Sequence, residues 1–157
     1  MSDLTEIEDV IHFDRLVVQT DLRAIAQILA WFEGFRKAPV SQAVWLQGQI
    51  ALVEAFTNAV RHAHELLPRQ TPITLEAGIY PDRLEIRVWD QGAPFDLAQL
   101  IDRVEQDYPE PLEHEAHWGA ALFKKLQDQH HWNIEYRCLN EGRNCLRLVK
   151  FCQQNSA

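Results

Sequence analysis

Residues 51–64 read ALVEAFTNAVRHAH, and further along the chain residues 88–96 read VWDQGAPFD. In the first stretch apolar side chains recur at steps of three to four residues: Val53, Phe56, Val60 and Ala63. This spacing predicts an α-helix with one buried face. Another face carries the polar side chains Glu54, Asn58, Arg61 and His62. A carboxylate and a carboxamide one turn apart, such as Glu54 and Asn58, can act on one ligand.

The elements around this helix follow from hydrophobic periodicity and turn residues. In chain order they are expected as a strand at 12–19, a helix from 22 to about 34, a helix from 39–41 to 67, strands at 73–80 and 83–89, a helix at 120–128, and strands at 132–139 and 145–151. Thr20-Asp21 supplies an N-cap for the first helix, and Pro68 ends the long one. The order predicts an α+β fold, a two-layer sandwich with helices packed on one face of a mostly antiparallel sheet.

The second motif lies where a strand leaves the sheet. Pro81-Asp82 provides turn residues between the two strands of a β-hairpin, whose second strand delivers Asp90 to its end. Residues 97–117 show no sustained strand pattern and contain Pro109 and Pro111. They carry six acidic residues against Arg103 alone, a net charge of −5. This segment is predicted to be a mobile cover over a site.

Composition narrows the class of protein. A chain of 157 residues that is 46% apolar can form one domain with a sizeable core, so residues 1–157 are expected to be a single domain. Three cysteines are too few, and odd in number, for a disulfide scaffold. No apolar run approaches the roughly 18 residues of a membrane helix, and the acidic start at residues 1–6 is unlike a leader peptide. We therefore expect a cytoplasmic protein without a membrane segment.

Charge and metal-ligand spacing exclude two further kinds of site. The net charge of −8 disfavours direct nucleic-acid binding, which depends on clustered Lys and Arg. The seven histidines show no arrangement with cysteines or carboxylates that predicts a tetrahedral metal centre.

The order of the motifs resembles a known family. Glu54-Ala-x-x-Asn58-Ala-x-x-His62 on a helix, Asp90-x-Gly92 after a hairpin, a variable segment, and Trp118-Gly119 before a helix resemble the GHKL-type, histidine-kinase-like ATP-binding fold. Within it, the chain is most similar to the bacterial anti-sigma-factor serine/threonine kinases. The resemblance covers nearly the whole chain, and it implies that residues 97–117 form an ATP lid.

The resemblance implies roles for three residues of the helix. Asn58 matches the asparagine that holds Mg²⁺ through its side-chain oxygen. Glu54 would be the catalytic base that accepts the proton of an incoming serine hydroxyl. Arg61, on the adjoining face, is expected to approach a phosphate of ATP with its guanidinium.

Three residues outside the helix are expected to bind ATP. Asp90 matches the carboxylate that accepts a hydrogen bond from the adenine amino group. Gly92 would let the backbone approach the adenine ring closely, because it has no side chain. Gly119 matches the last glycine of the family's second glycine motif, where backbone N–H groups at a helix start receive phosphate oxygens. Asn144 stands where the family often has a threonine near the adenine.

The resemblance also implies partners. The protein substrate would be a small anti-anti-sigma (STAS-type) domain, phosphorylated on a serine or threonine by using Mg²⁺ and ATP. Family members also bind a sigma factor and often form homodimers. Phosphorylation would then regulate transcription by deciding which partner is held.

Two other functions remain open at this point. His117 replaces the first glycine of the second glycine motif, and the acidic segment repels polyphosphate, so the alternative is a partner-binding regulator with weak or absent nucleotide turnover. A sensor-histidine-kinase catalytic domain is less expected, because the chain shows no phospho-acceptor helix pair and no receiver region.

Overall fold

The computed structural model describes residues 9–93 and 115–152 of the chain. The predicted lid at 97–117 lies outside the described residues, except for its last three positions. Among the described residues, no helix combines the length and the apolar character needed to cross a membrane.

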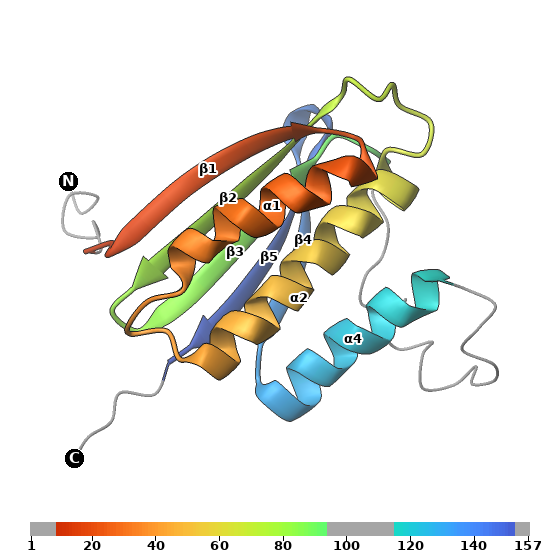
Figure 1. Cartoon of the computed structure of the whole chain (residues 1–157). Helices are drawn as coiled ribbons and strands as arrows, with labels where there is room; N and C mark the ends of the chain where they lie inside the picture. The colour runs from red at the N-terminus through yellow and green to blue at the C-terminus, as the bar shows by residue number, and fades with distance from the viewer. Residues whose placement is uncertain (1–8, 94–114, 153–157) are drawn as a thin grey trace, which may run out of the picture.

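A five-stranded sheet forms one layer of the fold (Figure 1). Its strands follow the spatial order β1-β2-β3-β5-β4, and every neighbouring pair is antiparallel. The strands are β1 (His12–Gln19), β2 (Pro72–Tyr80), β3 (Arg83–Asp90), β4 (Asn133–Leu139) and β5 (Arg143–Phe151). All five predicted strands are confirmed, with ends that shift by one or two residues.

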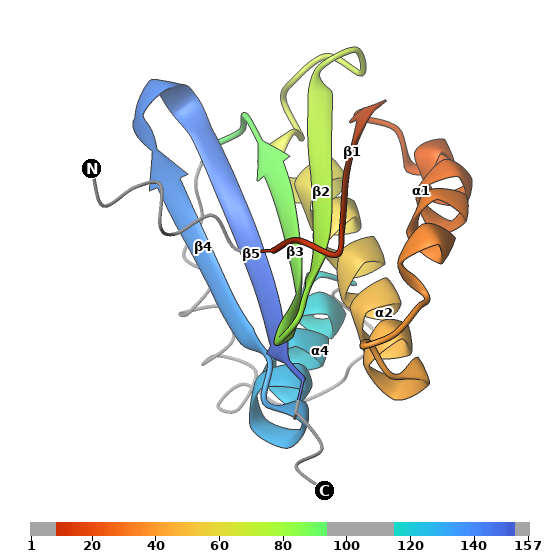
Figure 2. The ribbon, with the colours of Figure 1, turned by 90° about the vertical axis from the view of Figure 1, so that its left-hand side faces the viewer.

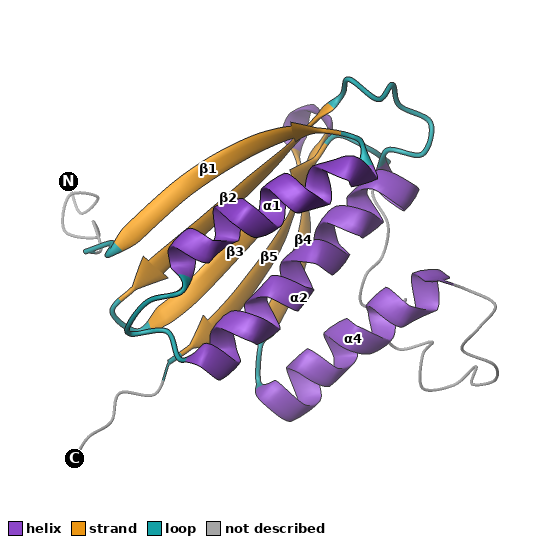
Figure 3. Cartoon of the chain, viewed as in Figure 1, coloured by secondary structure: helices purple, strands orange, loops and turns teal. Residues whose placement is uncertain are grey.

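The second layer consists of helices that cover one face of this sheet, as Figures 2 and 3 show. They are α1 (Ile25–Phe32), α2 (Gln42–Asn58) and α4 (Glu115–His130). The predicted α+β two-layer arrangement is therefore confirmed. Ser41 caps α2 by accepting the backbone N–H of Val44 at 3.2 Å, and Asp21 caps the short helical turn before α1 in the same way.

The core lies between the two layers. Four phenylalanines from the helical layer have no exposed surface: Phe32, Phe35, Phe56 and Phe123. They meet the sheet residues Ile73, Leu75, Ile79, Leu84, Ile86 and Leu148, which are also fully buried. Each such side chain contributes about 1.5–3 kcal/mol of burial free energy.

The buried face of α2 differs from the predicted stripe. Phe56 and Ala63 are buried as expected, but Val53 and Val60 are only half-buried. The buried apolar positions that this stripe left out are Trp45, Ala51, Leu52, Ala55 and Ala59. The physical reason is close packing: a Cβ added at Gly48 would lie 3.2 Å from the Leu84 side chain, so small residues face the sheet and the valines lie at the flank.

The long helix also ends earlier than predicted. It was expected to reach Leu67, but α2 ends at Asn58 and is followed by a π-helical turn, η4 (Ala59–Ala63). The N–H of His64 donates to the carbonyl of Ala59 at 2.8 Å, which closes this wider turn. Such turns are frequent at functional sites, because they redirect side chains.

The start of α4 is a further correction. The helix was expected to follow Trp118-Gly119, but it begins at Glu115 and therefore includes both residues. The acidic segment that precedes Trp118 contains two prolines, so the sequence pattern does not reveal the first turn of this helix.

Candidate functional site

The central strand, β3, ends in a buried carboxylate. Asp90 is its last residue and is only 4% exposed. Its Oδ1 accepts the backbone N–H of Gly92 at 3.0 Å and the side-chain amide of Asn144 at 2.7 Å, and its Oδ2 accepts the hydroxyl of Tyr136 at 3.2 Å. These three donors stabilise the buried negative charge and hold the carboxylate in one orientation.

The two side-chain donors come from the last hairpin. Asn144 of β5 lies directly opposite Asp90 in the sheet, and its amide also donates to the carbonyl of Gly92 at 2.9 Å. Burial, and next the negative charge of Asp90, raise the pKa of Tyr136, so its hydroxyl keeps its proton and remains a donor. The sequence analysis missed Tyr136, because alternation along a strand does not reveal which residue it faces on another strand.

A second buried group, His64, joins this loop to the helix end. Its Nε2 accepts the backbone N–H of Gln91 at 2.8 Å, and its Nδ1 lies 2.8 Å from the hydroxyl oxygen of Thr20. That hydroxyl donates its own proton to the carbonyl of Thr71 at 2.7 Å, so Nδ1 must be the protonated nitrogen. His64 is therefore neutral, in agreement with the lowering of its pKa by burial.

Gly92 allows the loop to pack directly on the helix end. A Cβ at this position would lie 1.8 Å from the carbonyl oxygen of Ala63, a distance that no side chain tolerates. The glycine is thus required for contact between the loop and η4. Whether it also lies against a ligand remains a prediction.

The residues of the predicted helix face differ in exposure. Asn58 is 8% exposed and Glu54 is half-buried, whereas Arg61 and His62 are exposed. Burial raises the pKa of Glu54, and the positive charge of Arg61 partly opposes this effect. Asn58 lies five residues before Ala63, about 7.5 Å along a helix axis. Because Gly92 packs on Ala63, the loop that contains Asp90 lies beside the end of this helical segment. That Glu54 and Asn58 act on the same ligand as Asp90 stays a prediction.

Gly119 and the predicted lid are not part of the group of residues around Asp90. Gly119 lies within α4 rather than ahead of it, so its proposed contact with phosphate does not follow from a helix start and stays a prediction. Residues 97–114 lie outside the described residues, so the structure does not test the lid.

The chain matches the family model of the histidine kinase-like ATPase domain over residues 18–150. It is also similar to curated proteins that are each named serine-protein kinase RsbW. The Bacillus licheniformis protein is 36% identical over 93 residues, which are 55% of this chain and 56% of that protein. The Oceanobacillus iheyensis protein is 35% identical over 91 residues (56% and 57%), and a Bacillus cereus protein is 40% identical over 76 residues (48% and 46%). The chain thus spans about half the length of the curated relatives it matches.

Proposed function

The chain belongs to the histidine kinase-like ATPase domain family, and from that premise we propose that it is a Mg-ATP-dependent protein serine/threonine kinase of the anti-sigma-factor type. The similarity to serine-protein kinases supports this function. The observation that carries it is the buried carboxylate of Asp90, held by Asn144 and Tyr136 beside the helix end that bears Glu54 and Asn58.

Asp90 is suited to select adenine. Among the described residues its Oδ2 accepts one hydrogen bond, from Tyr136, so a lone pair of this oxygen can accept the exocyclic amino group of the base. A carboxylate that keeps one orientation favours a base with a donor at that position over one with an acceptor. Asp90 therefore supplies the base selectivity that contacts with phosphate cannot supply.

Asn58 fits a magnesium ion by the chemistry of its side chain. Its carboxamide oxygen is a hard, neutral ligand of the kind that Mg²⁺ accepts together with phosphate oxygens and water. The ion, when bound, would neutralise charge on the phosphates. Arg61 lies three residues further along and would add a guanidinium on the same side.

Glu54 is the residue that we propose as the base. Its pKa is raised by burial, so its carboxylate is a stronger proton acceptor than an exposed glutamate. In the proposed step the serine oxygen of the substrate forms a bond to the γ-phosphorus, the bond to the bridging oxygen of ADP breaks, and Glu54 takes the serine proton.

The proposed protein substrate is a STAS-type anti-anti-sigma domain, and a sigma factor is the proposed second partner. Phosphorylation adds nearly two negative charges to the surface of the substrate. The acidic chain would then repel the product, release it and hold the sigma factor in its place. A homodimer is part of the same proposal.

The direct test is transfer of radiolabelled γ-phosphate to a purified STAS-domain candidate. We expect Mg²⁺-dependent transfer, and a loss of about 10²-fold or more in rate for Glu54→Gln. Glu65→Gln is the matched control, because it removes an exposed carboxylate beyond the end of the same helix and should leave the rate unchanged. Undiminished transfer by Glu54→Gln rejects the base assignment.

A non-catalytic regulator of the same fold is the second candidate. The observation that favours it is the position of His117 and Gly119 inside α4, together with a sequence at residues 93–114 that contains no glycine. Calorimetry with Mg-ATP discriminates between the two. Binding in the micromolar to millimolar range supports the kinase, whereas no binding with the STAS partner either present or absent supports the regulator.

A further inference from the structure

The sheet has a second face, which points away from the helices in Figure 2. Antiparallel pairing places directly opposed residues on the same face. One row crosses all five strands: Arg15, Glu76, Arg87, Arg147 and Glu135. The next row is Val17, Thr74, Trp89, Cys145 and Arg137. We call this surface the open face.

The open face is basic although the chain is acidic. Among the described strand residues it carries the arginines Arg15, Arg83, Arg87, Arg137, Arg143 and Arg147, and the glutamates Glu76, Glu85 and Glu135. Six positive and three negative charges leave +3 on this face, whereas the whole chain carries −8. Positive charge is therefore concentrated on one surface, away from the proposed nucleotide site.

The glutamates of this face hold the arginines in place. Glu85 is 3% exposed and accepts both Arg87, at 2.6 Å, and Arg147. Glu76 is 7% exposed and accepts Arg15 at 2.8 Å and the indole N–H of Trp89 at 2.6 Å. These two carboxylates lie beneath the surface, so the groups that solvent or a partner meets are guanidiniums with further N–H donors.

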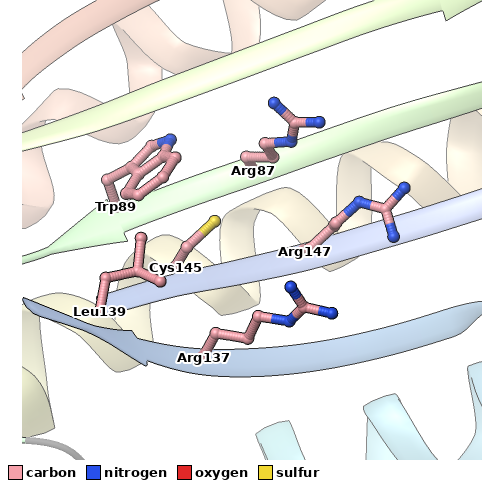
Figure 4. A pocket seen from close by; sticks show the side chains of 6 residues that line it. All are labelled: Arg87, Trp89, Arg137, Leu139, Cys145 and Arg147. Carbon is pink, nitrogen blue, oxygen red and sulfur yellow. The ribbon is translucent and has the colours of Figure 1, made fainter. Parts of the chain in front are cut away.

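A hollow of about 280 Å³ opens at the centre of these arginines (Figure 4). It is lined by Arg87, Trp89, Arg137, Leu139, Cys145 and Arg147. The Arg143 guanidinium lies 4.7 Å from the centre of the Trp89 ring. Burial raises the pKa of the Cys145 thiol to about 11, so the thiol is neutral and acts as an apolar part of the wall. An apolar wall rimmed by guanidiniums suits one apolar side chain with carboxylates on either side.

The open face also exposes large apolar side chains, of which Leu139 lines the hollow. Phe13 is 44% exposed, Val17 56%, Leu139 45% and Phe151 52%. Apolar groups rimmed by arginines are typical of protein-binding surfaces.

We propose that the open face docks an acidic segment of a partner protein, with one apolar side chain of that segment in the Trp89 hollow. Charge complementarity selects this occupant. Nucleic acid is also anionic, but its phosphate backbone carries no apolar side chain for the wall that Trp89, Leu139 and Cys145 form. A second copy of the chain would bring two faces of charge +3 together. The docking requires no nucleotide, so its test is independent of the proposed kinase activity.

The test is a titration of the isotope-labelled protein with a synthetic peptide that has a central phenylalanine flanked by glutamates, without nucleotide. We expect shifts of the Trp89 indole N–H signal and of the arginine Nε–H signals of the hollow. Arg137→Glu with Arg143→Glu should weaken binding by about tenfold or more, because attraction becomes repulsion. Both side chains are exposed, so this double variant spares the buried carboxylates.

The matched control is Lys37→Glu with Arg69→Glu, which changes the net charge equally at exposed positions outside the sheet. This control should bind the peptide within about twofold of the wild type. Equal weakening by both double variants overturns the proposal, as does peptide binding that leaves the Trp89 signal unmoved. If the wild-type protein self-associates and only the open-face variant abolishes this, the surface binds a second copy of the chain. If an oligonucleotide binds as tightly as the peptide, the surface binds anions in general. Both of these results also overturn the proposal.

Discussion

Replacement of Gly92 by alanine probes the contact between the Asp90 loop and the helix end. The added Cβ would lie 1.8 Å from the Ala63 carbonyl oxygen, whereas real Cβ atoms stay beyond 3.0 Å. The loop must therefore move by at least 1.2 Å. Such a shift breaks the hydrogen bond from the Gly92 N–H to Asp90 and the one from Asn144 to the Gly92 carbonyl.

The expected cost follows from these two hydrogen bonds. One involves a charged acceptor and the other a neutral acceptor, so Gly92→Ala should lower the free energy of unfolding by about 3 kcal/mol. Urea denaturation followed by circular dichroism measures this change. Calorimetry should also show at least about tenfold weaker binding of Mg-ATP, because Asp90 loses one of the three donors that orient it and the loop beside it moves.

Gly34→Ala is the matched control for this prediction. A Cβ at Gly34 would lie 3.8 Å from the nearest neighbouring atom, in the His12 ring, which is an ordinary contact. This variant should be as stable as the wild type or up to about 1 kcal/mol more stable. If Gly92→Ala unfolds at the same urea concentration as Gly34→Ala, the proposed packing of the loop is wrong.

Two further predictions concern the groups around this loop. Burial lowers the pKa of His64 below the 6.5 of the unfolded chain. Below about pH 6.5 the unfolded chain therefore binds a proton at this residue that the folded chain does not bind. The free energy of unfolding then falls as the pH drops. His64→Gln keeps an acceptor for Gln91 and a donor for Thr20 but cannot bind this proton. Urea denaturation between about pH 7.5 and 5 should therefore show that the free energy of unfolding depends less steeply on pH in this variant than in the wild type. An equal dependence on pH would contradict the assignment of His64 as a buried neutral group. Tyr136→Phe removes the donor to Asp90 Oδ2 and should cost about 1.5–3 kcal/mol of unfolding free energy, whereas a loss within experimental error would mean that this hydrogen bond is replaced by water.

Local patterns were enough to predict most of the elements. Alternation over residues 73–80 and 83–89, with turn residues between, correctly predicted β2 and β3, because each strand has one face against the core. The cap at Asp21 was also visible as a polar residue before an apolar repeat. The motifs in residues 51–64 and 88–96 indicated the family that the comparison later matched.

The boundaries and the buried side of α2 could not be predicted in the same way. The stripe of large apolar residues ignored Ala51 and Ala55, which face the sheet because the helix packs closely on Leu84. The π-helical turn after Asn58 leads to His64, whose ring is held by Thr20, just beyond β1, and by Gln91 of the loop after β3. The helix propensity of these residues contains no information about Leu84 of the sheet or about the groups that hold His64.

The sequence by itself determined the strands and most of the helices, because a periodic apolar pattern and a cap act over a few residues. Only the tertiary structure decided which side chains surround Asp90, since Asn144 is 54 residues away and Tyr136 is 46 residues away. It also decided that six arginines gather on one face of an acidic chain, because strand register brings distant residues into one row. Register depends on the packing of the whole sheet, and no short stretch of sequence specifies it.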